Sequence, residues 1–209
     1  MRTRLLAAAA ALTLVAGSAH AVTVSDPTGD FLPSFAGTHD ADLDVTSFGV
    51  TYEAGAAAFL LQATFAGAID PAKAGLYVIG VNTGTGAIKP FGGIGEPKVI
   101  FNQAIVIQKT GAGAVSGHTF TATISGDSFS ALVPLSFLPS TGFTPAQYGF
   151  NLWPRDGLGN NNQISDFAPQ NSTITGVPEP ATWALAVAGF GLLGVALRRQ
   201  RRADLPILA

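Results

Sequence analysis

The chain has 209 residues, of which only 11% are charged. It contains no cysteine, which excludes a disulfide framework and thiolate chemistry. Between residues 22 and 177, five basic residues stand against eleven acidic ones, a net charge of −6. A nucleic-acid partner is therefore not expected, because phosphate binding requires a cationic surface.

The N-terminal segment, 1–21, has the pattern of an export signal. Arg2 and Arg4 precede a run, 5–16, that is apolar except for Thr13, and Ala-His-Ala at 19–21 is a small-x-small cleavage site. The run is too short to span a bilayer, which needs about 20 apolar residues. We expect residues 1–21 to be a cleaved signal peptide, with Val22 as the mature N-terminus.

The following residues read as short strands separated by turns. Alternating or continuous apolar patterns predict seven strands, at residues 43–50, 57–65, 75–82, 99–108, 118–125, 128–133 and 147–153. The Ser-Gly-Asp turn at 125–127 predicts a hairpin between two of them. No long segment has a helical period before the C-terminal tail. The pattern predicts an all-β fold: a single antiparallel β-sandwich, jelly-roll or immunoglobulin-like, over residues 22–170.

Acidic residues gather at the start of this domain. Five carboxylates lie close together in the sequence: Asp26, Asp30, Asp40, Asp42 and Asp44. Calcium takes 6–8 oxygen ligands, and carboxylates on loops supply them. The order of an EF-hand loop is absent, and aspartates also cap turns. We treat the five as a candidate calcium site, with no other cofactor required.

The same region resembles the start of family-nine carbohydrate-binding modules and related DOMON-type sandwiches. The similarity rests on Asp-Pro-Thr-Gly-Asp at 26–30, then Asp-Leu-Asp at 42–44 opening a strand, then a hairpin. It covers about the first third of the domain. It implies a sandwich fold, a role for the acidic loop in a calcium site or ligand rim, and a hint of sugar binding.

Catalytic motifs are not found. There is no H-E-x-x-H, no G-x-S-x-G and no cysteine nucleophile, so we expect no catalytic residue and no enzyme activity. Trp153 and Arg155 are candidate sugar contacts, since alternation along residues 148–153 puts Trp153 on the face opposite Tyr148. The competing interpretation packs Trp153 in the core.

The C-terminal tail has three parts in order. After a polar linker at 171–176 come Val177, Pro178, Glu179 and Pro180, and then a segment, 181–197, that carries no charge. As a helix this segment would be about 25 Å long, slightly less than a hydrocarbon core. The positive-inside rule keeps the following arginines in the cytoplasm and the domain outside; they are Arg198, Arg199, Arg201 and Arg202. A short extension, 203–209, ends the chain.

This tail resembles the PEP-CTERM sorting tail. The similarity covers residues 177–202, and the extension at 203–209 departs from the usual end of such tails. The resemblance implies a Gram-negative host, an inner-membrane-tethered precursor, cleavage by exosortase, and delivery to the cell envelope or extracellular matrix. Glu179 is then a recognition residue. The alternative is a permanent single-pass anchor.

The sequence therefore favours an exported, non-enzymatic envelope or matrix protein associated with surface exopolysaccharide. The expected partners are the export machinery, exosortase, the membrane through the C-terminal helix, and polysaccharide. One alternative is a specific carbohydrate-binding module. Another is an ice-binding protein, for which Thr119, Thr121 and Thr123 offer one short threonine ladder.

Overall fold

The computed structural model describes residues 21–175, so the signal peptide up to residue 20 and the tail from residue 176 lie outside the described part. Within it, ten strands form two five-stranded antiparallel sheets. The first sheet has the order β1 (Val22–Ser25), β2 (Val45–Glu53), β3 (Ala58–Phe65), β9 (Ser128–Pro134), β8 (Thr123–Ser125). The second has the order β10 (Gly149–Arg155), β4 (Leu76–Asn82), β5 (Gln103–Gln108), β6 (Ala112–Val115), β7 (His118–Thr121).

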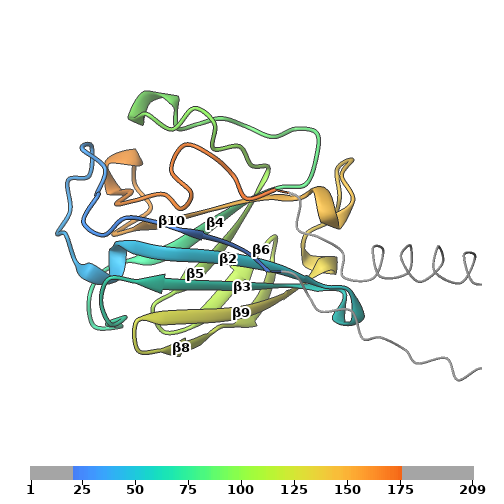
Figure 1. Ribbon diagram of the computed structural model, residues 1–209, viewed down its shortest axis with the longest axis horizontal. Helices are drawn as coiled ribbons and strands as arrows, with labels where there is room; N and C mark the ends of the chain where they lie inside the picture. Colours follow the sequence, from blue (N-terminus) through green and yellow to red (C-terminus); the bar gives the residue numbers. More distant parts are fainter. Residues whose placement is uncertain (1–20, 176–209) are drawn as a thin grey trace, which may run out of the picture. The chain divides into compact units, whose positions relative to one another are not determined.

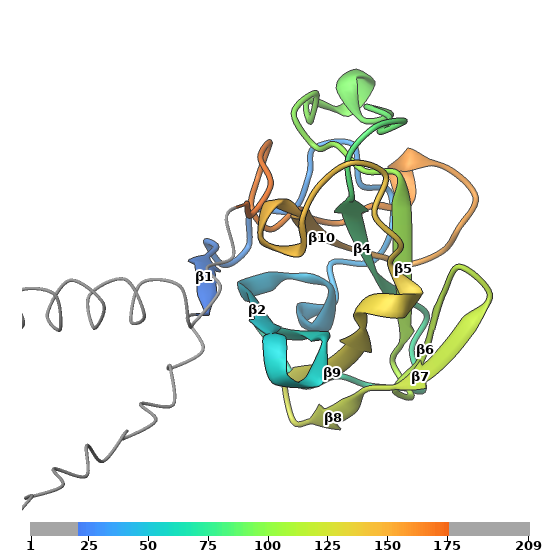
Figure 2. The same cartoon turned by 90° about the vertical axis from the view of Figure 1, so that its right-hand side faces the viewer.

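The two sheets lie face to face as the layers of a β-sandwich, which confirms the predicted fold class (Figures 1 and 2). The only helices among residues 21–175 are six 3-10 turns, at Ala41–Leu43, Ala54–Ala56, Gly92–Ile94, Leu135–Phe137, Pro145–Gln147 and Asn161–Gln163 (η1 to η6). No helix in this range combines the length and apolar character needed to cross a membrane.

One predicted strand changes sheet. Residues 118–125 pass from β7 in the second sheet to β8 in the first, and the break falls at Ala122, which is buried. The predicted hairpin at residues 125–127 is confirmed, because Ser125 pairs with Ser128 across a two-residue turn. The three threonines do not form one ladder on a single face, because Thr119 and Thr121 lie in β7 and Thr123 lies in β8, which belongs to the other sheet.

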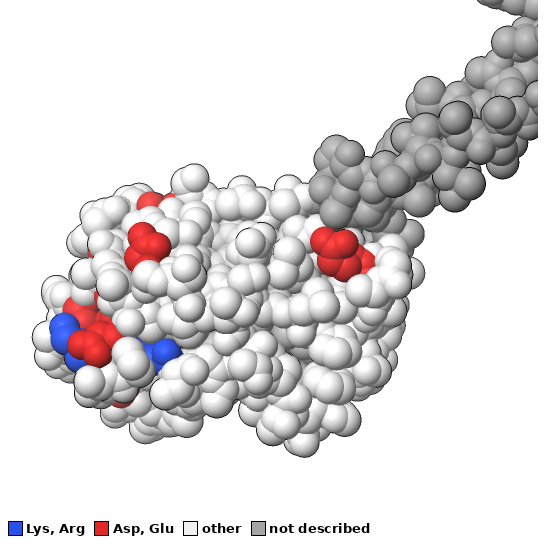
Figure 3. Space-filling model, turned by 90° about the horizontal axis from the view of Figure 1, so that it is seen from below, with Lys and Arg blue, Asp and Glu red and all other residues white. Residues whose placement is uncertain are grey.

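The outer face of the first sheet is rich in hydroxyl groups. The strand registers align two rows across all five strands. The first row is Ser25, Ser47, Thr64, Ser128 and Ser125, and the second is Thr23, Gly49, Gln62, Ser130 and Thr123. Neither row contains a charged residue. Seen from the side of β8 and β9, charged side chains gather near one end and at isolated points, with a wide uncharged area between them (Figure 3).

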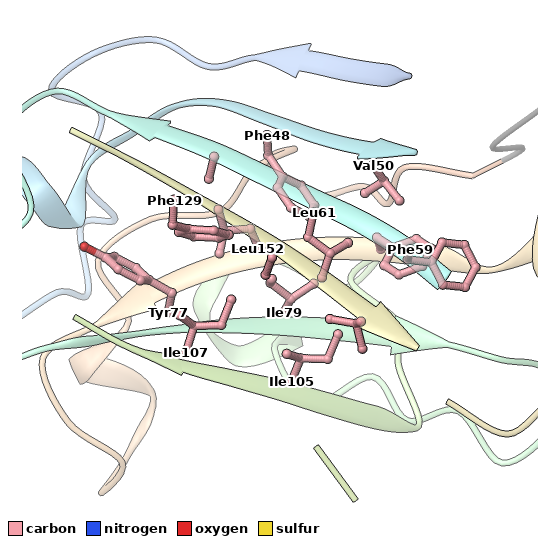
Figure 4. Close-up of a cluster of buried hydrophobic side chains, with 14 of the residues drawn as sticks. Phe48, Val50, Phe59, Leu61, Tyr77, Ile79, Ile105, Ile107, Phe129 and Leu152 are labelled. Carbon is pink, nitrogen blue, oxygen red and sulfur yellow. The ribbon is translucent and has the colours of Figure 1, made fainter. Parts of the chain in front are cut away.

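Two apolar clusters hold the domain together. The larger fills the space between the sheets with inward-facing side chains such as Phe48, Phe59 and Ile79, none of them exposed to solvent (Figure 4). The smaller lies on the opposite side of the second sheet, around Trp153 and Phe167, under the loops that follow β4 and β10. Both faces of β4 and β10 are therefore buried, which explains the almost continuous apolar run in β4.

Residues 171–175 also belong to this folded unit. Phe150 and Ile174 exchange two backbone hydrogen bonds, of 2.8 and 2.7 Å, and Ile174 is buried. The amide of Asn151 donates to the carbonyl of Ser172 at 2.8 Å. The segment expected to be a polar linker is thus attached to the edge of β10 as far as Ile174.

Candidate metal centre

Two segments, the connection between β1 and β2 and the segment after η6, bring four carboxylates together at one end of the sandwich. Asp26 follows β1, Asp30 lies in the next turn, and Asp44 directly precedes β2. Asp166 comes from the segment after η6, near the end of the described chain. One oxygen each of Asp26, Asp30 and Asp166 lie within 4.8 Å of one another. Figure 1 shows the loop after β1 beside the segment around η6.

Backbone hydrogen bonds fix Asp166 and Asp44 in place. The Oδ2 atom of Asp166 accepts from the amide of Val45 at 2.9 Å, and its Oδ1 atom accepts from the amide of Phe167 at 2.6 Å. The Oδ2 atom of Asp44 accepts from the amide of Gly29 at 2.7 Å, between Asp26 and Asp30. The carboxylates are thereby held by the backbone.

Several oxygens of this cluster have no protein partner. Asp26 Oδ2, Asp30 Oδ1 and Asp44 Oδ1 are buried and accept no hydrogen bond. Asp44 and Asp166 are each only 3% exposed. A buried polar atom without a partner costs free energy. Since all three atoms are acceptors, only a donor or a cation can satisfy them.

The electrostatics of the cluster are unfavourable for ionised carboxylates. Burial, followed by repulsion from Asp30, raises the pKa of Asp26 to about 7. Burial, followed by repulsion from Asp26, raises the pKa of Asp166 to about 8. The pKa of Asp44 is raised by burial as well. A divalent cation would reverse these shifts, because it attracts the ionised form.

The chemistry of this donor set fits calcium. Four carboxylates offer up to eight oxygens, which covers the 6–8 that calcium takes, and no nitrogen or sulfur donor accompanies them. Asp26 and Asp30 are partly exposed, so the cluster is open to solvent on their side. The cluster can therefore admit a hydrated cation.

The tail outside the described residues carries the match to a known family. A family model for the PEP-CTERM protein-sorting motif matches residues 176–202. The chain carries a PEP-CTERM sorting motif. This agrees with the resemblance seen in Val177, Pro178, Glu179 and Pro180 and in the arginines that end the tail. No curated protein and no solved structure matches the chain.

The PEP-CTERM motif makes the protein an exosortase substrate that is exported and sorted to the envelope or the extracellular space. The predicted membrane helix, 181–197, and the arginine cluster lie outside the described residues, as do most of the signal peptide and residues 203–209. The resemblance of the domain to family-nine carbohydrate-binding and DOMON-type sandwiches stays a prediction beyond the shared sandwich architecture.

Two of the five predicted calcium ligands have other partners in the folded domain. Asp40 forms a surface ion pair with Lys73, with 2.6 Å between Oδ1 and Nζ. Asp42 forms a buried ion pair with Lys109 at 2.7 Å, in which the side chains are 2% and 3% exposed. The structure therefore brings together Asp26, Asp30 and Asp44 and leaves Asp40 and Asp42 outside the cluster.

Sequence reasoning missed Asp166 and Glu96. Asp166 is far from the acidic cluster in sequence and follows an ordinary polar loop, so no local pattern identifies it. Glu96 is 3% exposed, accepts a hydrogen bond from the amide of Asn171, and contributes to the raised pKa of Asp26 by repulsion. Both residues reach the site through tertiary contacts alone.

Trp153 does not form a sugar platform. As predicted from alternation, its side chain faces away from the space between the sheets, but the loops after β4 and β10 cover it and it is only 2% exposed. Its ring lies across Gly80 on β4, where an added Cβ would approach a ring carbon to 2.5 Å. Without an exposed ring face, Trp153 cannot stack on a sugar at the surface.

Proposed function

We propose that the protein is a non-enzymatic component of the cell envelope or extracellular matrix whose β-sandwich is closed by one calcium ion. The observation that carries the proposal is the cluster of Asp26, Asp30, Asp44 and Asp166 with three buried oxygens that lack partners. Calcium would tie the loop after β1 to the segment after β10, joining the two ends of the domain. Sites of extracellular modules bind calcium with a Kd of about 10⁻⁴–10⁻³ M.

A pair of carboxyl groups with raised pKa values is also found in acid–base catalysis. The cluster favours cation binding instead. Asp30 and Asp44 lie beside the pair formed by Asp26 and Asp166, and their charges repel the ionised carboxylate that a catalytic base would need. An apolar pocket lies on the second sheet, and none of the four aspartates is in its lining. These features support a structural role for the site.

Calorimetric titration tests the calcium site. Full chain stripped with a chelator is titrated with calcium chloride, next to the variants Asp166→Asn and Asp40→Asn. We expect one ion per chain for the wild type and for Asp40→Asn, whose carboxylate is paired with Lys73. Asp166→Asn should bind at least tenfold more weakly. No calcium heat, together with a melting temperature that a chelator leaves unchanged, would overturn the proposal.

Association with exopolysaccharide is supported by two uncharged, hydroxyl-rich rows on the outer face of the first sheet. Two rows across five strands present serine, threonine and glutamine side chains, which can donate to and accept from sugar hydroxyls. Most of these side chains are partly or fully exposed. The face is broad enough to contact an extended chain at several points, as weak polysaccharide binding requires.

The polysaccharide proposal is tested by co-sedimentation with the insoluble exopolysaccharide of the producing strain. Gln62→Glu with Ser130→Glu puts two charges in the middle of the face, whereas Lys89→Glu adds negative charge in the loop after β4. The double variant should lose the bound fraction and Lys89→Glu should keep it. Equal binding of all three proteins would contradict a role for this face.

The route to the surface follows the PEP-CTERM tail. We propose an inner-membrane-tethered precursor in a Gram-negative host, with the helix at 181–197 as a temporary anchor. Pulse-chase labelling in exosortase-positive and exosortase-deficient cells tests this, because the precursor should stay in the membrane fraction only when exosortase is missing. A tail retained in both strains would support a permanent anchor.

A further inference from the structure

A pocket of about 330 Å³ opens on the outer side of the second sheet. Its floor is made by residues of β4, β5 and β10, and its walls by the loops after β4 and β10. All but one of its lining side chains are apolar, namely Val78, Ile88, Pro90, Phe91, Phe101, Ala104, Val106, Trp153 and Leu158, and the exception is Arg155. The volume lies at the lower end of the range of small-molecule sites.

The rim of the pocket exposes large apolar side chains. Ile88 is 54% and Leu158 is 65% exposed, the two highest values among the large apolar side chains of residues 21–175. They come from different loops, far apart in the sequence, and both line the same pocket. Exposed apolar area concentrated at a concave site is typical of a binding surface.

The charged side chain in the lining of this pocket is the guanidinium of Arg155. Arg155 has no carboxylate within 4 Å among the described residues; its Nη2 atom donates to the carbonyl of Asn160 at 2.8 Å, and its Nε atom donates to the carbonyl of Gly157. The other donors of its guanidinium are not used by these bonds. Lys89 lies between the lining residues Ile88 and Pro90.

The indole of Trp153 provides an independent observation. Its Nε1 atom is buried and has no hydrogen-bond partner, although the ring is 2% exposed and contacts Phe91 and Phe101. A buried indole N–H usually finds an acceptor. The apolar lining and Arg155 together call for a ligand that is apolar in its body and carries an acceptor group.

We propose that this pocket binds a small apolar molecule with a carboxylate group, the body among Ile88, Phe101 and Leu158 and the carboxylate at Arg155. A sugar would leave most of its hydroxyl groups without partners against nine apolar side chains. A cationic ligand would meet Arg155. The site is separate from the aspartate cluster and does not depend on calcium or on the proposed matrix role.

Tryptophan fluorescence of the full chain tests the proposal. The chain has two tryptophans, so Trp183→Phe leaves Trp153 as the only reporter, and the protein is studied in phosphatidylcholine nanodiscs. The probes are 3-phenylpropanoate and its uncharged analogue 3-phenylpropanamide. We expect both to change the Trp153 emission and the carboxylate to bind about tenfold more tightly, as is typical of a charge-assisted hydrogen bond.

Three variants separate the pocket from non-specific effects. Arg155→Gln should remove the tenfold preference for the carboxylate and leave binding of the amide unchanged, and Lys98→Gln, a cation outside the lining, should change neither. Ala104→Phe fills the pocket and should abolish binding of both probes. If Arg155→Gln fails to fold, Arg155→Lys keeps the charge and should retain part of the preference.

Three results would overturn the proposal. The first is an emission that neither probe changes at millimolar concentration. The second is equal affinity for carboxylate and amide in the protein with Arg155 intact. The third is binding that Ala104→Phe leaves unaltered.

Discussion

Asp26→Asn should change stability in opposite directions with and without calcium. Asp26 Oδ2 accepts no hydrogen bond, so the isosteric amide removes a charge without breaking a contact of that atom. In chelator at pH 8, the carboxylate is mostly ionised, because its pKa is about 7, and burial and repulsion from Asp30 and Asp44 make the ionised form unfavourable. The amide should therefore stabilise the metal-free protein.

The magnitude follows from the pKa of Asp26. A rise from 3.8 to about 7 corresponds to about 4 kcal/mol of free energy between the charged and neutral forms. Solvent screens this partly exposed site, and part of the pKa shift belongs to the coupled carboxyl of Asp166. We therefore expect Asp26→Asn to raise the free energy of unfolding by about 1–2 kcal/mol. For a chain of this length, that gain raises the melting temperature by roughly 2–8 °C.

Calcium should reverse the sign. At a calcium concentration of about 100 times Kd, binding stabilises the wild type by about 2.7 kcal/mol. Asp26→Asn loses a charged ligand and with it most of this stabilisation, so it should melt below the wild type. Differential scanning calorimetry with chelator and with calcium at about 100 times the Kd found by titration measures both differences. Asp40→Asn is the control and should stay within about 1 kcal/mol in both conditions, because its ion pair is exposed. A shift of the same sign in both conditions would refute the reasoning.

Three further results are expected. In chelator, the melting temperature should fall as pH rises from about 4 to 8. The carboxyls of Asp26 and Asp166 have pKa values near 3.8 in the unfolded chain but about 7 and 8 in the folded protein, so ionisation favours unfolding over this pH range. With calcium bound, thermal melts should no longer show this decrease. Asp42→Asn should lower the free energy of unfolding by about 3–5 kcal/mol at any calcium concentration, because it leaves Lys109 buried and unpaired. Urea unfolding of the double variant Asp42→Asn with Lys109→Met should show that part of this free energy is regained. Deleting residues 177–209 should release the protein to the periplasm or medium, and unchanged surface localisation on cell fractionation would contradict sorting by the tail.

Most of the sandwich could be predicted because hydrophobic alternation is local. The strands β2, β3, β4, β9 and β10 all overlap predicted segments. The missed strands β1 and β6 have four residues each, and β6 consists of small residues with little apolar contrast. The sheet change at Ala122 was not predictable, since alternation continues through it while the pairing partner changes from β6 to β9.

The metal centre was only partly predictable for a related reason. Acidic density identified the loop that holds Asp26, Asp30 and Asp44, because these residues are close in sequence. It could not separate them from Asp40 and Asp42, whose lysine partners are distant in the chain. The alternation of side chains along β10 likewise placed Trp153 on the correct face of the sheet, but it could not reveal the loops that cover Trp153.

The most direct test of the account is anomalous X-ray scattering from crystals of the full chain or its exported form grown with 5 mM calcium. We predict one calcium peak between Asp26, Asp30 and Asp166, about 2.3–2.6 Å from carboxylate oxygens, with Asp44 as a further ligand. Density at full occupancy for these side chains with no anomalous peak among them would contradict it.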